Sequence, residues 1–342
     1  MKHLFLLACI CLSMQVFGQN QQYQVSLVGF YNLENLFDTL DTPNKHDSEF
    51  TPTGSKAYNT SIYLDKLGKL DKVISQIGTD LSPDGLAVVG VCEVENKKVL
   101  LDLVKEQGIA SRNYQVVHHE SNDFRGIDNA LLYNPKYFKL DQSKVYEVEL
   151  PMVNGEKRTT RDILHVSGSL AGERIHFLVN HWPSRSGGEK GSAPKRAAAA
   201  KKCRQIVDNI YKSEPNAQIV VMGDLNDDPA DPSVMEHLGV QVKESKVRNN
   251  DLFNPYYKIH KGGDGTLCYR GNWNLFDQII VSQDLMEEDG FYYKQAHIFK
   301  KQWMFTKEGR YKGYPLRTFG GSTYLGGYSD HFPSYIVLLK KI

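Results

Sequence analysis

The feature that most constrains the fold is a series of short apolar segments that alternate with polar stretches along almost the whole chain. Each segment is rich in Val, Ile, Leu and aromatic residues and has the length of a single β-strand. In chain order they are residues 25–31, 86–94, 114–119, 129–133, 163–170, 174–181, 218–222, 276–281 and 334–339. A chain with this many strands must bury them in at least one large sheet.

Helical patterns lie between some of these segments. A helix that ends before Gly78 is predicted by apolar residues spaced along one helix face, namely Leu64, Leu67, Leu70, Ile74 and Ile77. Residues 96–107 and 193–211 are further helix candidates. Strands that alternate with helices in this way indicate an α/β protein.

Hairpin signals occur in the same chain. Asn154-Gly155, a dipeptide that favours a two-residue turn, lies between the strand-like residues 145–150 and 158–166. Hairpins mixed with strand–helix units favour a mixed-sheet sandwich over an all-parallel Rossmann sheet. Because no linker or low-complexity stretch interrupts the pattern, we expect one domain over residues 23–342, and we expect it to be a monomer.

The N-terminus has the features of a secretory signal peptide. Lys2 and His3 precede an apolar run over residues 4–14, and small residues before Gly18 suit cleavage there. Residues 1–18 are therefore predicted to be removed and the protein to be secreted or periplasmic. Cys9 would be the lipidated residue of a lipoprotein signal, but it comes too early in the apolar run. No later segment is long and apolar enough to cross a membrane.

The balance of charge excludes a protein coated with positive charge. Lys plus Arg is 41 and Asp plus Glu is 40 in 342 residues. Any contact with nucleic acid would therefore have to be local. The basic residues within 195–204 are typical of a solvated helix face, with contact to a phosphate backbone as the alternative.

Polar side chains gather where the predicted strands end or begin. The clusters, in chain order, are Asn32 to Asn35, Glu93 to Asn96, Asn180 to Arg185, Asp224 to Asp228, Asp277, and Ser329 to His331. Strand ends in an α/β layer meet at a shared edge, which is a common place for a ligand site. Loops with random polar residues would not supply so many oxygen and imidazole groups to one edge.

The side chains in these clusters suit hydrolysis of a phosphate ester. That reaction needs a hard cation at the phosphoryl oxygens, a base for the attacking water, and donors that stabilise the developing charge. Carboxylate and Asn carbonyl oxygens are ligands that suit Mg²⁺ or Mn²⁺. The sequence has no His/Cys cluster with structural-zinc spacing, no Walker A loop, no G-x-S-x-G motif and no dinucleotide fingerprint.

Taken in order, these motifs resemble the endonuclease/exonuclease/phosphatase family. The matching pieces are Tyr31-Asn32-Leu33, Cys92-Glu93-Val94, Asn180-His181, Gly223-Asp224-Leu225-Asn226, Phe276-Asp277 and Ser329-Asp330-His331. The family includes pancreatic-type deoxyribonuclease, the apurinic/apyrimidinic endonucleases, the inositol-polyphosphate 5-phosphatases and secreted sphingomyelinases. The resemblance runs from about residue 25 to the C-terminus. It implies a four-layer α-β-β-α sandwich, in which two mixed β-sheets pack face to face with helices outside.

The resemblance also implies a metal site. Glu93 would be the main metal carboxylate, with Asn32 beside it and Asp330 completing the polar floor. The implied ion is Mg²⁺, with Mn²⁺ or Ca²⁺ as alternatives. Glu34 departs from the deoxyribonuclease pattern but resembles an acid of other branches. The resemblance therefore leaves open whether one or two metal ions are bound.

Further roles follow from the same resemblance. Asp224 would be a catalytic residue that positions the water or the phosphate, together with Asn226. His331 would contact the phosphate or transfer a proton, oriented by Asp277, and His181 matches the second histidine of the deoxyribonuclease branch. Two looser matches are Arg161, as a phosphate-holding arginine, and Asp128, as the acid that pairs with the branch's first histidine.

These residues also have ordinary structural interpretations. Asp224 and Asn226 are typical of a turn before Pro229, and a histidine on an apolar strand, such as His181, is often a core residue. We expect a metal-dependent phosphodiesterase acting on DNA or RNA. The alternatives are a phospholipid or sphingolipid head-group phosphodiesterase, a sugar-phosphate phosphatase, and a catalytically silent binding module. Retention of Glu93 and His331 with the rest of the set argues against the last.

Overall fold

Two mixed sheets packed face to face form the centre of the protein in a computed structural model, which describes residues 21–342 except 153–154 and 157. The predicted signal peptide and Asn154 of the predicted turn lie outside the described residues. The first sheet contains, in spatial order, β14 (Phe291–Ile298), β17 (Ser334–Lys341), β1 (Tyr23–Leu36), β2 (Val88–Val94), β4 (Asp128–Tyr133) and β3 (Gln115–His118). It is mixed because β1 runs parallel to β2 and antiparallel to β17.

The second sheet is mixed as well. It contains, in spatial order, β5 (Phe138–Tyr146), β6 (Ile163–Leu170), β7 (Glu173–His181), β8 (Ile219–Asp224), β13 (Asp277–Ser282), β10 (Leu252–Phe253) and β9 (Val240–Gln241). Strand β8 is parallel to β7 and antiparallel to β13. The predicted α/β fold with two mixed sheets is confirmed.

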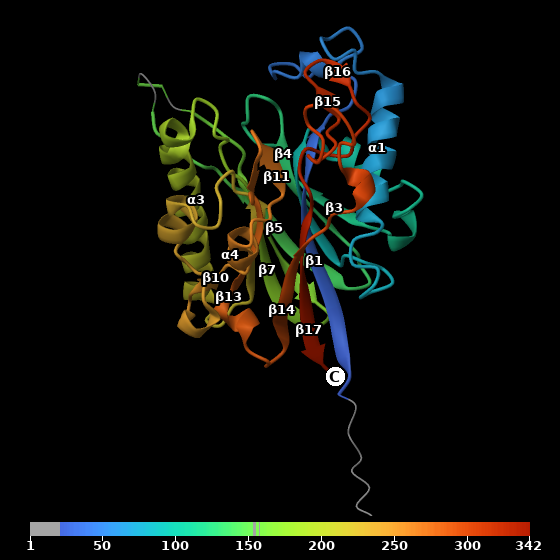
Figure 1. The fold of residues 1–342 in the computed structure, drawn as a ribbon. Coiled ribbons are helices and arrows are strands. Elements are labelled where there is room, and N and C mark those ends of the chain that lie inside the picture. Colours follow the sequence, from blue (N-terminus) through green and yellow to red (C-terminus); the bar gives the residue numbers. More distant parts are fainter. Residues whose placement is uncertain (1–20, 153–154, 157) are drawn as a thin grey trace, which may run out of the picture.

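Helices cover the outer faces of both sheets (Figure 1). On the first sheet lie α1 (Thr60–Ile74) and α2 (Lys97–Leu103), and on the second lies α3 (Glu189–Ser213). Between the sheets, Phe30 and Val88 share a buried cluster with Phe177 and Met222. The remaining small elements are α4 (Tyr256–Lys261) and two hairpins, β11 (Leu267–Tyr269) with β12 (Asn272–Asn274) and β15 (Phe319–Gly320) with β16 (Thr323–Tyr324). No helix in the described residues is long and apolar enough to span a membrane.

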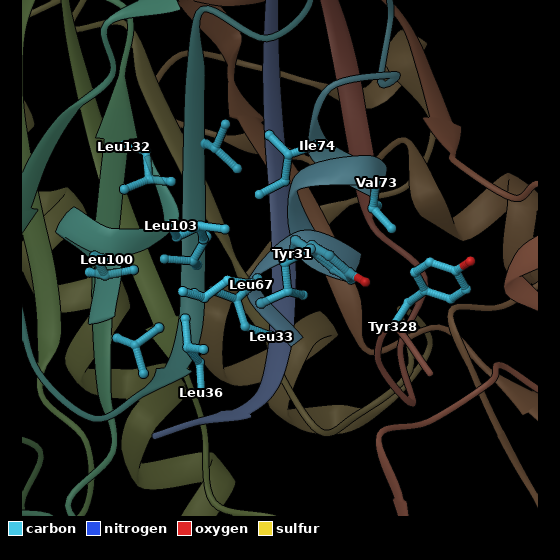
Figure 2. Packing of buried hydrophobic residues seen from close by; sticks show 14 of the residues in the cluster. Tyr31, Leu33, Leu36, Leu67, Val73, Ile74, Leu100, Leu103, Leu132 and Tyr328 are labelled. Atoms are coloured by element: carbon cyan, nitrogen blue, oxygen red, sulfur yellow. The ribbon is translucent and has the colours of Figure 1, made fainter. Parts of the chain in front are cut away.

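Helix α1 follows from the spacing of its apolar residues. Leu67 and Ile74 face the first sheet, and Figure 2 shows them among side chains of β1 and α2. The side chain of Asn59 caps the helix by accepting from Ile62 N at 3.1 Å. The helix ends at Ile74, earlier than predicted, and the chain turns through Gly78 at φ +69°. A Cβ at Gly78 would lie 2.2 Å from Leu27, so this turn requires glycine.

The structure differs from the predicted strands in several places. Strands β5 and β6 pair antiparallel, but β5 begins at Phe138 and ends at Tyr146. Residues 147–150 and 158–162 therefore lie outside both strands, and Pro151 has no N–H for a ladder. Strand β14 was not predicted, because its polar and half-buried sequence lacks an apolar run. Strand β1 extends to Leu36, past an irregularity after Asn32.

A buried histidine pair crosses β6 and β7. His165 Nε2 lies 3.0 Å from His176 Nδ1, and His176 Nε2 lies 3.1 Å from Glu214 Oε2. Burial, then the charges of His176, Lys144 and Arg174, lower the pKa of His165 to about 3. The folded protein therefore holds His165 neutral at pH values where the unfolded chain, with an ordinary histidine pKa of about 6.5, binds a proton.

This pair makes stability depend on pH in a predictable direction. Below about pH 6.5 the unfolded state binds a proton that folded His165 does not, so its contribution to stability falls as the pH falls. From pH 6.5 to pH 5 the loss is about 2 kcal/mol. Urea unfolding at both pH values should show a smaller loss for His165→Phe than for the unmodified protein. Equal losses in the two proteins would contradict this account of His165.

Candidate active site

The site lies where several strands end at one end of the sandwich. In the second sheet, His181 of β7 and Asp277 of β13 each pair in register with Asp224 of β8. From the first sheet, Asn32 of β1 reaches across, and its Nδ2 donates to Asp224 Oδ2 at 3.1 Å. The edge predicted from the strand ends therefore exists, and Asp224 lies at its centre.

His331 is held at this edge by its neighbours in the loop before β17. The Ser329 hydroxyl donates to the Asn32 carbonyl at 2.7 Å and accepts from His331 N at 3.1 Å. The ring Nδ1 of His331 lies 2.6 Å from Asp277 Oδ2, which fixes the ring with Nε2 turned toward Asp224 Oδ2 at 3.9 Å. Sequence analysis predicted this orientation by Asp277.

The His331–Asp277 pair favours a protonated imidazole. Burial opposes the charge, but the carboxylates of Asp277 and Asp224 outweigh it and raise the pKa of His331 well above its ordinary value. Asp277 is fully buried. The imidazolium can therefore donate a proton or a hydrogen bond from Nε2 to a ligand beside Asp224.

His181 lies on the other side of Asp224 in a different state. Its Nε2 is 3.7 Å from Asp224 Oδ2 and 3.8 Å from Glu93 Oε1. Burial, followed by the positive charges of Arg161 and Arg125, lowers the pKa of His181 well below its ordinary value. Two buried histidines thus flank one carboxylate. His331 favours the protonated imidazolium, and His181 favours the neutral imidazole.

Asp224 and Asn226 form a tight turn after β8. Asn226 N donates to Asp224 Oδ1 at 3.0 Å, and Asn226 adopts a left-handed φ of +50°. Its Nδ2 donates to the Trp182 carbonyl at 3.0 Å, which ties this turn to the end of β7. Burial, then the nearby Asp277 and Glu93, raises the pKa of Asp224 to about 7 against the opposing effect of His331.

The acids from the first sheet lie in strained backbone. Glu93 has φ +59° and Glu34 has φ +48°, a region that costs non-glycine residues about 1–2 kcal/mol. Glu93 Oε2 accepts from Asn35 N at 3.0 Å. Strain held at two clustered carboxylates is typical of a functional site.

Arg317 links the remaining acids. Its Nη2 donates to Asp330 Oδ2 at 2.9 Å and its Nε to Glu34 Oε1 at 3.3 Å. Glu34 Oε2 also accepts from Thr318 N at 2.7 Å. Burial, then the charge of Asp330, raises the pKa of Glu34 to about 7, although Lys66 and Arg317 oppose the shift. Asp330 therefore belongs to the site through Arg317.

The donor set fits a divalent metal ion. Glu93, Glu34 and Asp224 supply carboxylate oxygens, the ligands that Mg²⁺ and Mn²⁺ prefer, whereas the Asn32 amide oxygen accepts from Glu34 N at 2.8 Å. Burial, followed by neighbouring carboxylates, raises the pKa values of Glu34 and Asp224, and a bound cation would favour their ionised forms. Cys92 Sγ lies near His181 and Asp224, but burial raises its thiol pKa well above the ordinary value and disfavours a thiolate ligand.

The two looser predictions have different outcomes in space. Arg161 is buried, and its Nη2 donates to the Trp182 carbonyl at 2.7 Å, next to His181. Asp128 Oδ2 lies 3.0 Å from His118 Nε2, so its partner is His118 in place of a site histidine. We correct the expected pairing of Asp128 accordingly: it lies at the start of β4, where it also accepts from Ser121 N at 2.9 Å.

Sequence reasoning missed several residues that complete the site. Arg317, Thr318 and Lys66 bind or neutralise Glu34, and Arg125 donates to the side chain of Asn35. None of them lies at the end of a predicted strand. A signal existed only for Arg317, which follows a run of basic and aromatic residues shortly before Ser329-Asp330-His331.

The fold has counterparts among known proteins. The sequence model of the endonuclease/exonuclease/phosphatase family matches residues 27–340. An endonuclease/exonuclease/phosphatase family protein from Bacteroides thetaiotaomicron has 16% identity and a TM-score of 0.56, covering 94% of this chain and 97% of its own. A mannosyl-6-phosphatase from the same species has 17% identity and a TM-score of 0.55, covering 92% of this chain and 99% of its own.

A further similar structure is the D. rerio protein TDP2 in complex with a single-strand DNA product. It has 14% identity and a TM-score of 0.53, covering 92% of this chain and 98% of its own. No protein of curated function matches the sequence significantly. At these identities the structures establish the shared fold, and the family match over nearly the whole described chain establishes descent. The chain belongs to the endonuclease/exonuclease/phosphatase family of phosphoric ester hydrolases, which typically depend on a divalent metal.

Proposed function

We propose that this protein is an exported metal-dependent phosphodiesterase that hydrolyses phosphodiester bonds of nucleic acid. The observation that carries the proposal is the placement of a buried histidine on each side of Asp224, with Nε2 atoms at 3.7 Å and 3.9 Å from the same carboxylate oxygen. Such an arrangement can serve an in-line displacement, in which Asp224 orients the attacking water while the histidines stabilise the developing charge and protonate the leaving oxygen. Export rests on the signal-like residues 2–18 alone.

Each residue has a defined task in this proposal. Glu93 and Asn32 would hold the metal, which when bound supplies charge neutralisation at the phosphoryl oxygens. Asp224 orients the attacking water, and the Asn226 turn keeps Asp224 in place through its backbone N–H. His331 and His181 stabilise the developing negative charge and protonate the leaving oxygen.

A nucleic-acid substrate is supported by one similar structure, and a sugar phosphate by one cavity. The D. rerio protein TDP2 is bound to a single-strand DNA product. A cavity of about 190 Å³ beside the acids is lined by Glu34, Asn35, Arg317 and Phe319 among others, and it suits one small polar group. Because a similar structure is a mannosyl-6-phosphatase, a sugar-phosphate phosphatase is the second candidate.

A substrate panel tests the proposal. The full chain would be incubated with plasmid DNA, single-stranded DNA, RNA, sphingomyelin, mannose 6-phosphate and inositol phosphates, each with Mg²⁺, Mn²⁺ or Ca²⁺. We expect DNA or RNA to be cleaved faster than the other substrates at equal phosphoester concentration. Fastest release of phosphate from mannose 6-phosphate would contradict the nucleic-acid proposal and favour the second candidate.

A further inference from the structure

Two loops that border the site carry aromatic and basic side chains with no part in the proposed hydrolysis. The β11–β12 hairpin exposes Tyr269 and Arg270, and the segment 305–315 exposes Arg310 and Tyr311. The tyrosines are 61% and 56% exposed, which is high for aromatic residues outside a recognition surface. We call the surface formed by Tyr269, Arg270, Arg310 and Tyr311 the aromatic–basic platform.

The two loops are joined to each other and to the site. Gly271 N, next to Arg270, donates to the hydroxyl of Tyr314 at 2.6 Å. At the base of the hairpin, Thr266 accepts from Asp277 N with its hydroxyl at 3.3 Å and from Phe332 N with its carbonyl at 2.8 Å. The base of the hairpin is thus bonded to Asp277 and to Phe332, the residue that follows His331. Figure 1 shows β11 toward the same end of the sandwich as β15 and β16.

The second loop, together with the residues on either side of it, carries a local excess of positive charge, although the chain as a whole is almost neutral. Residues 299–317 contain one acid, Glu308, and six basic residues, namely Lys300, Lys301, Lys307, Arg310, Lys312 and Arg317. Among the described residues, no carboxylate forms an ion pair with the exposed Arg270, Lys307, Arg310 or Lys312. These cations are therefore available to bind phosphate groups. They form a local basic surface of the kind that a protein with almost no net charge needs for contact with nucleic acid.

The side chains of the platform have the geometry of stacking surfaces. The Arg270 guanidinium lies 5.3 Å from the Tyr269 ring centroid, and that of Arg310 lies 5.6 Å from the Tyr311 ring centroid. Arg270 has φ +51° at the hairpin tip, where glycine or asparagine would be relaxed. The chain therefore keeps an arginine at a strained position whose side chain stays beside an exposed ring.

We propose that the aromatic–basic platform binds single-stranded nucleic acid on the His331 side of the site, with bases stacked on Tyr269 and Tyr311 and phosphates held by Arg270 and Arg310. Alternating rings and cations match the repeat of base and phosphate along a strand. An unpaired strand is required, because the faces of bases inside a duplex are covered. This inference deepens the proposed function and depends on it.

Fluorescence anisotropy of a labelled oligo-dT strand, measured with the full chain in EDTA so that no cleavage occurs, tests the platform. Tyr269→Ala with Tyr311→Ala should weaken binding by roughly tenfold or more, whereas Tyr269→Phe with Tyr311→Phe, which keeps both rings, should restore it. Arg270→Gln with Arg310→Gln should reduce the slope of log affinity against log salt by about 1.4. Lys139→Gln on β5 with Lys212→Gln on α3 removes the same charge from exposed positions elsewhere and is the matched control.

Three results with the variants would overturn the platform. They are equal loss of binding in the Lys139/Lys212 control, no loss in the alanine pair, and loss of binding to phosphatidylglycerol vesicles in place of oligo-dT, which would indicate a lipid surface. The unmodified protein separates this inference from the proposed function. Hydrolysis of bis-(p-nitrophenyl) phosphate without oligo-dT binding would overturn the platform alone. Platform-dependent oligo-dT binding without strand hydrolysis in Mg²⁺ would overturn the proposed function and support the platform.

Discussion

Replacing His331 or His181 by alanine should lower turnover of a phosphodiester substrate by roughly two to four orders of magnitude, as loss of an acid–base or oxyanion-stabilising group does. The expectation follows from geometry, since both Nε2 atoms face Asp224 from opposite sides. Because both rings act on one transition state, the double variant should lose much less than the product of the two single losses. Steady-state kinetics at saturating metal would measure all three variants.

Two controls make the histidine result specific. Asp277→Asn keeps the shape of the His331 partner but removes its charge, so it should lower turnover while leaving His331 in place. His118→Ala removes a ring that contacts Asp128 and Glu120 instead of Asp224 or Asp277, and it should cost far less than His331→Ala. Turnover near that of the unmodified protein in either single site variant would exclude that histidine from the mechanism.

Glu93→Gln and Asp224→Asn should impair the enzyme in different ways. Glu93 comes from β2 and would supply charge to the metal, so Glu93→Gln should raise the Mg²⁺ concentration for half activity, with some activity returning at high metal. Asp224 comes from β8 and would orient or deprotonate water, which added metal cannot replace. Asp224→Asn should therefore lower the maximal rate at every Mg²⁺ concentration.

Calorimetric titration with Mg²⁺ separates the two roles independently of activity. The affinity should fall more for Glu93→Gln than for Asp224→Asn. Both variants should stay folded, because removing one of several clustered buried acids also relieves their repulsion. Full rescue of Asp224→Asn by metal, with none for Glu93→Gln, would show that the two assignments are reversed.

The sequence contained enough information for most of the fold because the central strands of both sheets are buried on both faces. Strands such as β8, in which every residue is buried, have continuous apolar sequences and are easily detected. Strand β14 was missed since its outer residues, including Lys294 and Gln295, are exposed and leave no apolar run. The end of β5 was misplaced because apolar Val148 is buried without being part of a strand.

The site was predictable where function and strand ends coincide. Glu93, His181, Asp224 and Asp277 lie at strand ends and Asn32 at the irregularity in β1, so topology alone brings them together. Arg317 could not be placed from sequence, since it reaches Glu34 across a separation of 283 residues through an irregular segment. For Asp128, the expected histidine lay among the site residues, but His118 of the neighbouring β3, in register with Ala130, reaches Asp128 diagonally.

The account's central claim is that the buried acids and histidines around Asp224 form a metal-dependent phosphodiesterase. The most direct measurement is the rate of bis-(p-nitrophenyl) phosphate hydrolysis by the full chain before EDTA treatment, after it, and after Mg²⁺ is restored. We predict that hydrolysis falls to the background rate in EDTA and returns with Mg²⁺, as an oxygen-ligand site for a hard cation requires. Hydrolysis that continues undiminished in EDTA, or that is absent with Mg²⁺, Mn²⁺ and Ca²⁺ alike, would contradict the account.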